Sequence, residues 1–74
     1  MMKYKVRKNG TTEFVSEILS DHVEFVKGWD NPYAISFPTL AAATRAKEKI
    51  FEIEEYHTTV EKLDVIWGML VQLK

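Results

Sequence analysis

The first residues of the chain alternate between apolar and basic side chains. Tyr4 and Val6 take every second position from Lys3 to Lys8, which is the period of a β-strand with one face in water. Asn9-Gly10 follows, and both residues tolerate the positive φ of a type I′ turn. The pattern therefore predicts a β-hairpin whose returning strand covers residues 12–19.

Two further apolar runs predict additional strands. The first of them covers residues 23–26, and it is followed by the loop 28–32, which is rich in turn residues. A short strand is expected at 33–37, before Pro38, which cannot donate a hydrogen bond to a sheet. Together these runs predict an antiparallel hairpin or meander of three to four short strands.

The apolar period changes to 3.6 residues from Leu40 onward, which predicts an amphipathic helix over about 39–57. Thr39 is a suitable N-cap for this helix. Small residues near its start allow close packing on a sheet, and larger ones are expected to fill the wider end. The apolar positions are Ala43, Ala46, Ile50, Phe51 and Ile53.

The last segment fits two structures. As a strand, residues 63–73 place an apolar side chain at every second position. As a helix over 59–73, the segment has a capping box from Thr58 to Glu61 and a broad apolar stripe. We favour the strand, because Val, Ile and Trp suit a sheet and a strand would cover an open sheet edge. The expected fold class is α+β.

Length and composition predict a single compact domain over residues 1–74 with a thin stability margin. The chain has no Cys, so neither disulfides nor thiolate metal sites can add stability. Hydrophobic packing or association with another chain must supply it. No signal peptide or membrane span is visible, and we expect a cytoplasmic protein.

The sequence predicts neither an enzyme nor a cofactor or metal site. Glu54 and His57 have the Glu-x-x-His spacing of a metal-binding helix face, but a di-iron site needs two such pairs and further carboxylates. His22 follows Asp21 without a nucleophile elbow nearby. The glycines are isolated, so no loop can cradle a phosphate. Both histidines are interpreted as residues without chemistry.

Two surface features indicate binding. Aromatic residues flank a polar turn in the loop of Trp29, Asp30, Asn31 and Tyr33, and such residues often anchor protein interfaces. The alternative is that both rings fold back over a small core.

The second feature is a possible basic surface, although the net charge of −1 argues against a polyanion-binding protein. Its alternative is an ordinary solvated face. The residues concerned are Lys3, Lys5, Arg7, Arg45 and Lys47.

The C-terminal segment also predicts self-association. If residues 63–73 form one strand, Ile66 and Leu70 lie on the face opposite Val65, Trp67 and Met69. Both faces then carry large apolar groups, and a domain with one long helix covers only one face of its sheet. Soluble monomers rarely expose large apolar patches. We therefore expect a homodimer with contacts at Ile66, Trp67 and Leu70.

The stretch Ala34-x-x-Phe37-x-Thr39-x-x-x-Ala43, preceded by a hairpin, resembles short proteins encoded by phages and prophages of Gram-positive bacteria. The resemblance implies strands followed by a capped helix, and a small accessory protein that acts by binding another protein. The leading hypothesis is thus a non-enzymatic protein that binds itself or a phage or host protein. The alternative is a nucleic-acid-binding module that uses the basic N-terminal strand with Trp29 or Tyr33 as stacking groups.

Overall fold

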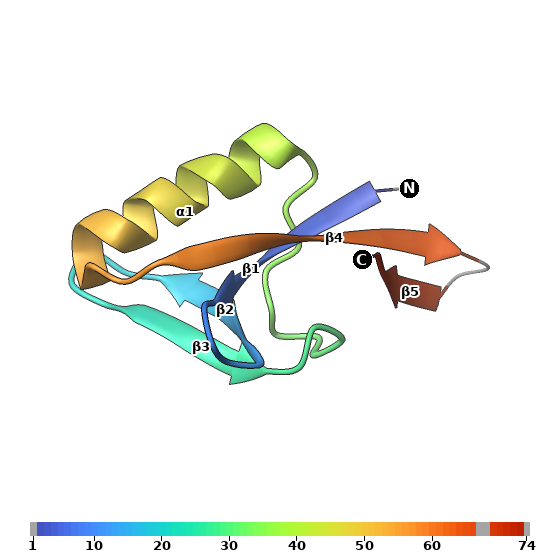
Figure 1. Cartoon of the computed structure of the whole chain (residues 1–74), viewed down its shortest axis with the longest axis horizontal. Coiled ribbons are helices and arrows are strands. Elements are labelled where there is room, and N and C mark those ends of the chain that lie inside the picture. The colour runs from blue at the N-terminus through green and yellow to red at the C-terminus, as the bar shows by residue number, and fades with distance from the viewer. Residues whose placement is uncertain (1, 67–68, 74) are drawn as a thin grey trace.

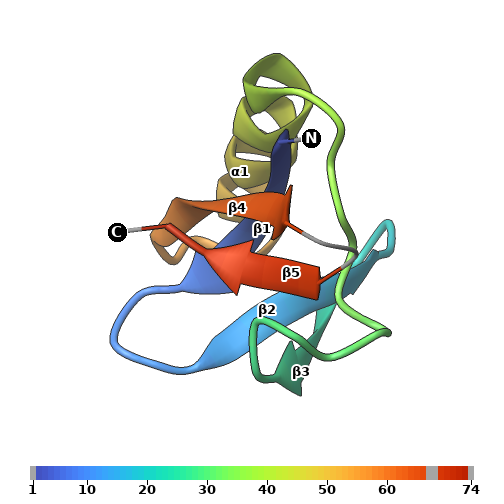
Figure 2. The same cartoon turned by 90° about the vertical axis from the view of Figure 1, so that its right-hand side faces the viewer.

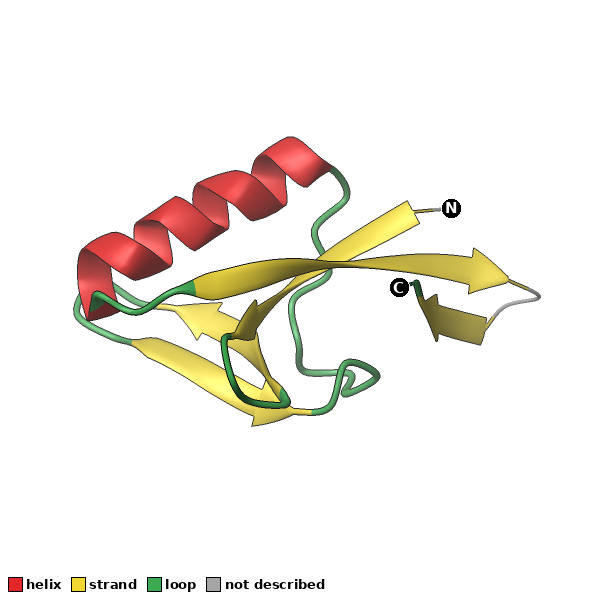
Figure 3. Ribbon diagram, viewed as in Figure 1, coloured by secondary structure: helices red, strands yellow, loops and turns green. Residues whose placement is uncertain are grey.

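The structure, a computed structural model, describes residues 2–66 and 69–73. Within them a five-stranded antiparallel sheet packs against one helix, which confirms the α+β class but with five strands instead of three to four (Figure 1, Figure 3). The strand order in the sheet is β3-β2-β1-β4-β5. The elements are β1 (Met2–Lys8), β2 (Glu13–Ile18), β3 (Val23–Lys27), α1 (Leu40–Glu54), β4 (Thr58–Ile66) and β5 (Met69–Gln72).

The predicted N-terminal hairpin is confirmed, but its turn has a different geometry. The Thr11 amide donates to the Lys8 carbonyl at 3.2 Å, and Gly10 has a φ of 76°. A type I′ turn needs a positive φ at both central residues, and Asn9 does not have one. A positive φ at the third residue alone is typical of a type II turn.

The helix α1 begins as predicted and ends earlier than predicted. The Thr39 hydroxyl accepts a hydrogen bond from the Ala42 amide at 3.1 Å, which confirms the N-cap. At the other end Glu55 adopts a left-handed φ of 59°, and its amide donates to the Phe51 carbonyl at 2.9 Å. This cap ends the helix at Glu54, three residues before the predicted end.

The helix packs on one face of the sheet through its small and branched residues. Ala43, Ala46 and Ile50 are buried together with Val6 and Val15 of the strands. Phe51 was expected to fill this core, but 46% of it is exposed. It follows Ile50 by one residue, so it lies on the flank of the helix.

The predicted strand at 33–37 instead crosses between two strands. β1 and β2 pair only at Arg7 and Phe14, and beyond that point they separate. The Ile35 amide donates to the carbonyl of Val15 on β2 at 2.9 Å. Phe37 exchanges two hydrogen bonds with Tyr4 on β1, at 3.0 and 2.7 Å. The segment 35–37 therefore bridges the gap between β1 and β2 and makes only one isolated β-bridge.

Both faces of the sheet are consequently covered near its centre. Val6 faces α1, so its neighbours Lys5 and Arg7 face the other way, as do their paired residues Phe14 and Glu61. Phe14 is buried on that face, and Figure 1 shows that the loop between β3 and α1 begins on the side of the sheet away from the helix before it crosses to the start of α1. The expectation that the second face is left open is wrong here, because this loop covers it.

The C-terminal segment forms two strands. β4 begins at Thr58 and pairs with β1, and β5 returns antiparallel along the second half of β4 (Figure 2). A single strand over 63–73 is therefore wrong in its bounds, and the alternative helix over 59–73 is wrong. Ile66 is paired with Met69 in this ladder. The reversal lets β5 bond to β4 instead of extending past the sheet.

Candidate functional site

The structure places Lys5 inside the protein and not on a basic surface. Only 3% of the residue is exposed, and its Nζ donates to the carbonyl of Trp29 at 2.7 Å and to that of Asn31 at 3.4 Å. Burial lowers the pKa of Lys5, and the nearby Asp30 partly opposes this shift. Alternation of side chains cannot reveal this, because the covering loop lies more than twenty residues away in sequence.

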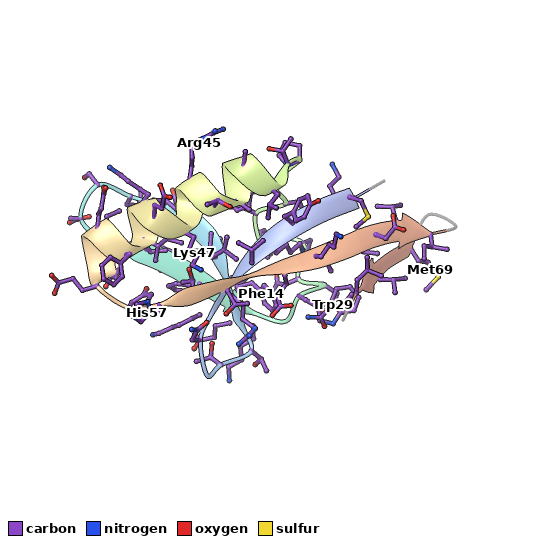
Figure 4. All side chains as sticks on the ribbon, turned by 45° about the horizontal axis from the view of Figure 1, so that its top comes forward. Phe14, Trp29, Arg45, Lys47, His57 and Met69 are labelled. Atoms are coloured by element: carbon purple, nitrogen blue, oxygen red, sulfur yellow. The ribbon has the colours of Figure 1, made fainter. Side chains whose placement is uncertain are left out.

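The other basic residues are not gathered on one surface. Arg7 lies on the same strand face as Lys5, where its Nε donates to Glu61 at 2.8 Å. Arg45 and Lys47 are exposed on α1, which covers the opposite face of the sheet (Figure 4). Lys3 is half-buried on β1. The five residues of the predicted basic surface therefore fall on two sides of the molecule.

The loop of Trp29, Asp30, Asn31 and Tyr33 is folded back in part. Trp29 is half-buried and its carbonyl binds Lys5. The side chain of Asn31 accepts from the Tyr33 amide at 2.9 Å and donates to the Lys27 carbonyl at 3.1 Å. Asp30 is exposed, and so is 77% of Tyr33. The two residues thus differ: Trp29 is half-buried in the loop that covers the sheet, and Tyr33 faces solvent.

The two histidines make separate contacts. His22 is exposed between Asp21 and Glu24, at 2.8 and 3.0 Å, and these hydrogen bonds raise its pKa. His57 stacks on Phe51 with ring centroids 5.2 Å apart. Among residues 2–66 and 69–73, no cluster of three or more His, Cys, Asp or Glu side chains could hold a metal ion.

A shallow depression of about 500 Å³ lies beside the Phe51–His57 pair, between α1 and the start of β4. Tyr56, Thr58 and polar residues of α1 also line it. The Thr58 hydroxyl is buried and has no hydrogen-bond partner within the described part of the chain.

The end of the β4–β5 hairpin is the place where large apolar side chains are exposed together. We call these residues the hairpin end. Figure 1 shows α1 over the first half of β4, whereas β5 lies beside the second half, so the helix leaves this end uncovered. The residues and their exposed fractions are Val65 37%, Ile66 41%, Met69 68% and Val71 36%. Figure 4 shows Met69 at this extremity.

The hairpin changes which residues share a face. Ile66 pairs with Met69, and Val65 pairs with Leu70, and paired residues in an antiparallel ladder point to the same side. Ile66 and Leu70 therefore lie on opposite faces, contrary to the expectation from a single strand. Trp67, the third predicted dimer contact, lies outside the described residues. Gly68 between two apolar runs is the sequence signal that could have indicated the reversal.

No described helix is both long enough and apolar enough to cross a membrane. Comparison of this chain with protein-family models, curated proteins and solved structures finds no match.

Proposed function

We propose that this chain is a non-enzymatic protein-binding module and that the hairpin end is its contact surface. The observation that carries the proposal is the exposure of Val65, Ile66, Met69 and Val71 at one extremity of the sheet. Residues 65–73 contain no Asp, Glu, Lys or Arg. Interfaces are enriched in large apolar residues and depleted in charge at their centres, and this segment has that composition.

The energetics favour covering this surface. Burial of apolar area contributes about 25 cal/mol per Å², and a domain of this size buries a smaller share of its surface by itself than a larger domain does. A partner at the hairpin end would supply burial that α1 does not. This proposal agrees with the accessory role implied by the resemblance to phage and prophage proteins, acting in the cytoplasm on a protein partner.

Nucleic-acid binding receives no supporting observation. The proposed basic strand uses Lys5 to hold the loop and Arg7 to pair with Glu61. Non-specific affinity for a polyanion requires cations that are available to phosphates. We therefore retain protein binding as the single proposed function.

The proposal is tested by sedimentation of the wild type and of Ile66→Lys, each at tens of micromolar, alone and after mixing with the soluble proteins of the host. Ile66→Lys places a charge in the hairpin end, so it should abolish association. Leu40→Lys is the matched control, because Leu40 is 56% exposed at the start of α1. Association that survives Ile66→Lys, or a wild type that associates with nothing, contradicts the proposal.

A further inference from the structure

We infer that the hairpin end binds a second copy of this chain, by antiparallel pairing of β5 with β5 of the other copy. This inference rests on the proposed function and names its partner.

The hydrogen-bond pattern identifies the outward groups of β5. The Leu73 amide donates to the Lys62 carbonyl of β4 at 2.9 Å. In a strand, the amide and carbonyl of one residue point to the same side, and successive residues alternate. Met69 and Val71 therefore direct their backbone groups at β4 together with Leu73. Leu70 and Gln72 direct theirs outward, where the described sheet has no further strand. In Figure 2, β5 is the element nearest the viewer, at the outside of the fold.

These outward groups are self-complementary. A two-fold axis through Val71 places Leu70 of one copy opposite Gln72 of the other, and each such pair exchanges two hydrogen bonds. Val71 then faces Val71 of the second copy at the axis. Met69 of one copy lies opposite Leu73 of the other, so the exposed apolar side chains on that face come together across the contact. The two sheets become one continuous sheet.

The charge of the segment favours a second copy as the occupant. Because residues 65–73 carry no charged side chain, self-pairing places no like charges opposite each other, an arrangement that destabilises paired strands. The opposite sheet edge is protected in a way that β5 is not. There β3 has the exposed charges Glu24 and Lys27, and its Val23 amide is already bonded to the Glu54 carboxylate at 3.0 Å. Charged side chains are a common protection of edge strands.

Gln72→Pro and Gln72→Ala form the test pair. The Gln72 amide points away from β4, so proline there removes a donor that only the self-pair uses, and proline is tolerated on edge strands. Alanine removes the same side chain and keeps the amide. Two symmetry-related hydrogen bonds are lost in the proline dimer, so we expect its dissociation constant to rise at least about tenfold. Gln72→Ala should stay within about threefold of the wild type.

Sedimentation equilibrium gives the dissociation constants, and amide hydrogen exchange by NMR gives an independent result on the wild type. Exchange at Leu70 and Gln72 should slow as the protein concentration rises, even if Gln72→Pro perturbs the strand. Equal dimerisation of the proline and alanine variants, together with a monomeric Ile66→Lys, overturns edge pairing and leaves the proposed function intact. A wild type that is monomeric at about 200 μM overturns the inference of a second copy. Binding of a different protein at the hairpin end would then still support the proposed function.

Discussion

Replacement of Lys5 by methionine should destabilise the protein more than any change at the neighbouring lysines of β1. Methionine keeps the length and much of the apolar stem, and it removes the ammonium that binds the carbonyls of Trp29 and Asn31. Hydrogen bonds to a charged group contribute about 1.5–3 kcal/mol each. The bond of 2.7 Å should count fully, and the one of 3.4 Å should count for little.

The cost of burying the ammonium opposes this gain, and the lowered pKa of Lys5 reflects that cost. A methionine recovers part of it but leaves two carbonyls of the covering loop without their donor. We therefore expect a net loss of about 2 kcal/mol from the free energy of unfolding. For a domain of this size, a loss of that order lowers Tm by roughly 10 °C.

Urea and thermal unfolding followed by tryptophan fluorescence measure this effect, since Trp29 is in the affected loop. Lys3→Met is the matched control on the same strand face, and it should change the free energy of unfolding by less than about 0.5 kcal/mol. The reasoning is refuted if Lys5→Met is as stable as the wild type. In that case the ammonium would contribute no more than its burial costs.

Three further changes test other features of the structure. Thr58→Val should raise the free energy of unfolding by about 1 kcal/mol in urea titrations, because it removes a buried hydroxyl without a partner and keeps the shape; Thr58→Ser, which keeps the hydroxyl, should give no such gain. Glu55→Gly should raise it by about 0.5–1 kcal/mol, since glycine adopts the left-handed φ of 59° without strain, whereas Glu52→Gly inside the helix should lower it by about 1 kcal/mol. The hydrogen bonds of His22 raise its pKa above the ordinary 6.5, so the folded state binds its proton more tightly than the unfolded state. The stabilisation is therefore present below pH 6.5 and is lost as the pH rises through the folded pKa. Tm measured from pH 6 to 8 should fall more for the wild type than for His22→Gln, and parallel curves would contradict this assignment.

Local periodicity predicted the elements whose partners are close in sequence. The N-terminal hairpin, β3 and the capped helix follow from alternation, turn residues and the 3.6-residue period between Ala43 and Ile50. The start of β4 was missed because Thr58 to Glu61 also fits a helix capping box. Its strand conformation is determined by pairing with β1, fifty or more residues earlier, and no local pattern encodes that pairing.

The sequence predicted the candidate site only in part, because its geometry also depends on contacts between distant segments. The apolar character of residues 63–73 indicated an association surface, but the distribution over its faces depends on the reversal between Ile66 and Met69. The burial of Lys5 depends on a loop that crosses the sheet. An alternating strand with three basic residues looks the same whether water or a loop covers it. The charge pattern therefore predicted that Lys5 lies on the surface, whereas the structure buries it.

The position of β1 at the middle of the sheet has a consequence for the order of events during synthesis. The central strand is made before the other described strands, yet the strand that pairs with its whole length is β4, which ends at Ile66. Until then β1 can pair with β2 only near Arg7 and Phe14. Contacts between distant segments are slow to form, because closing the loop between them costs entropy before any contact is gained. The growing chain should therefore stay without a stable sheet until β4 has been translated, and until then its apolar strands are exposed to aggregation.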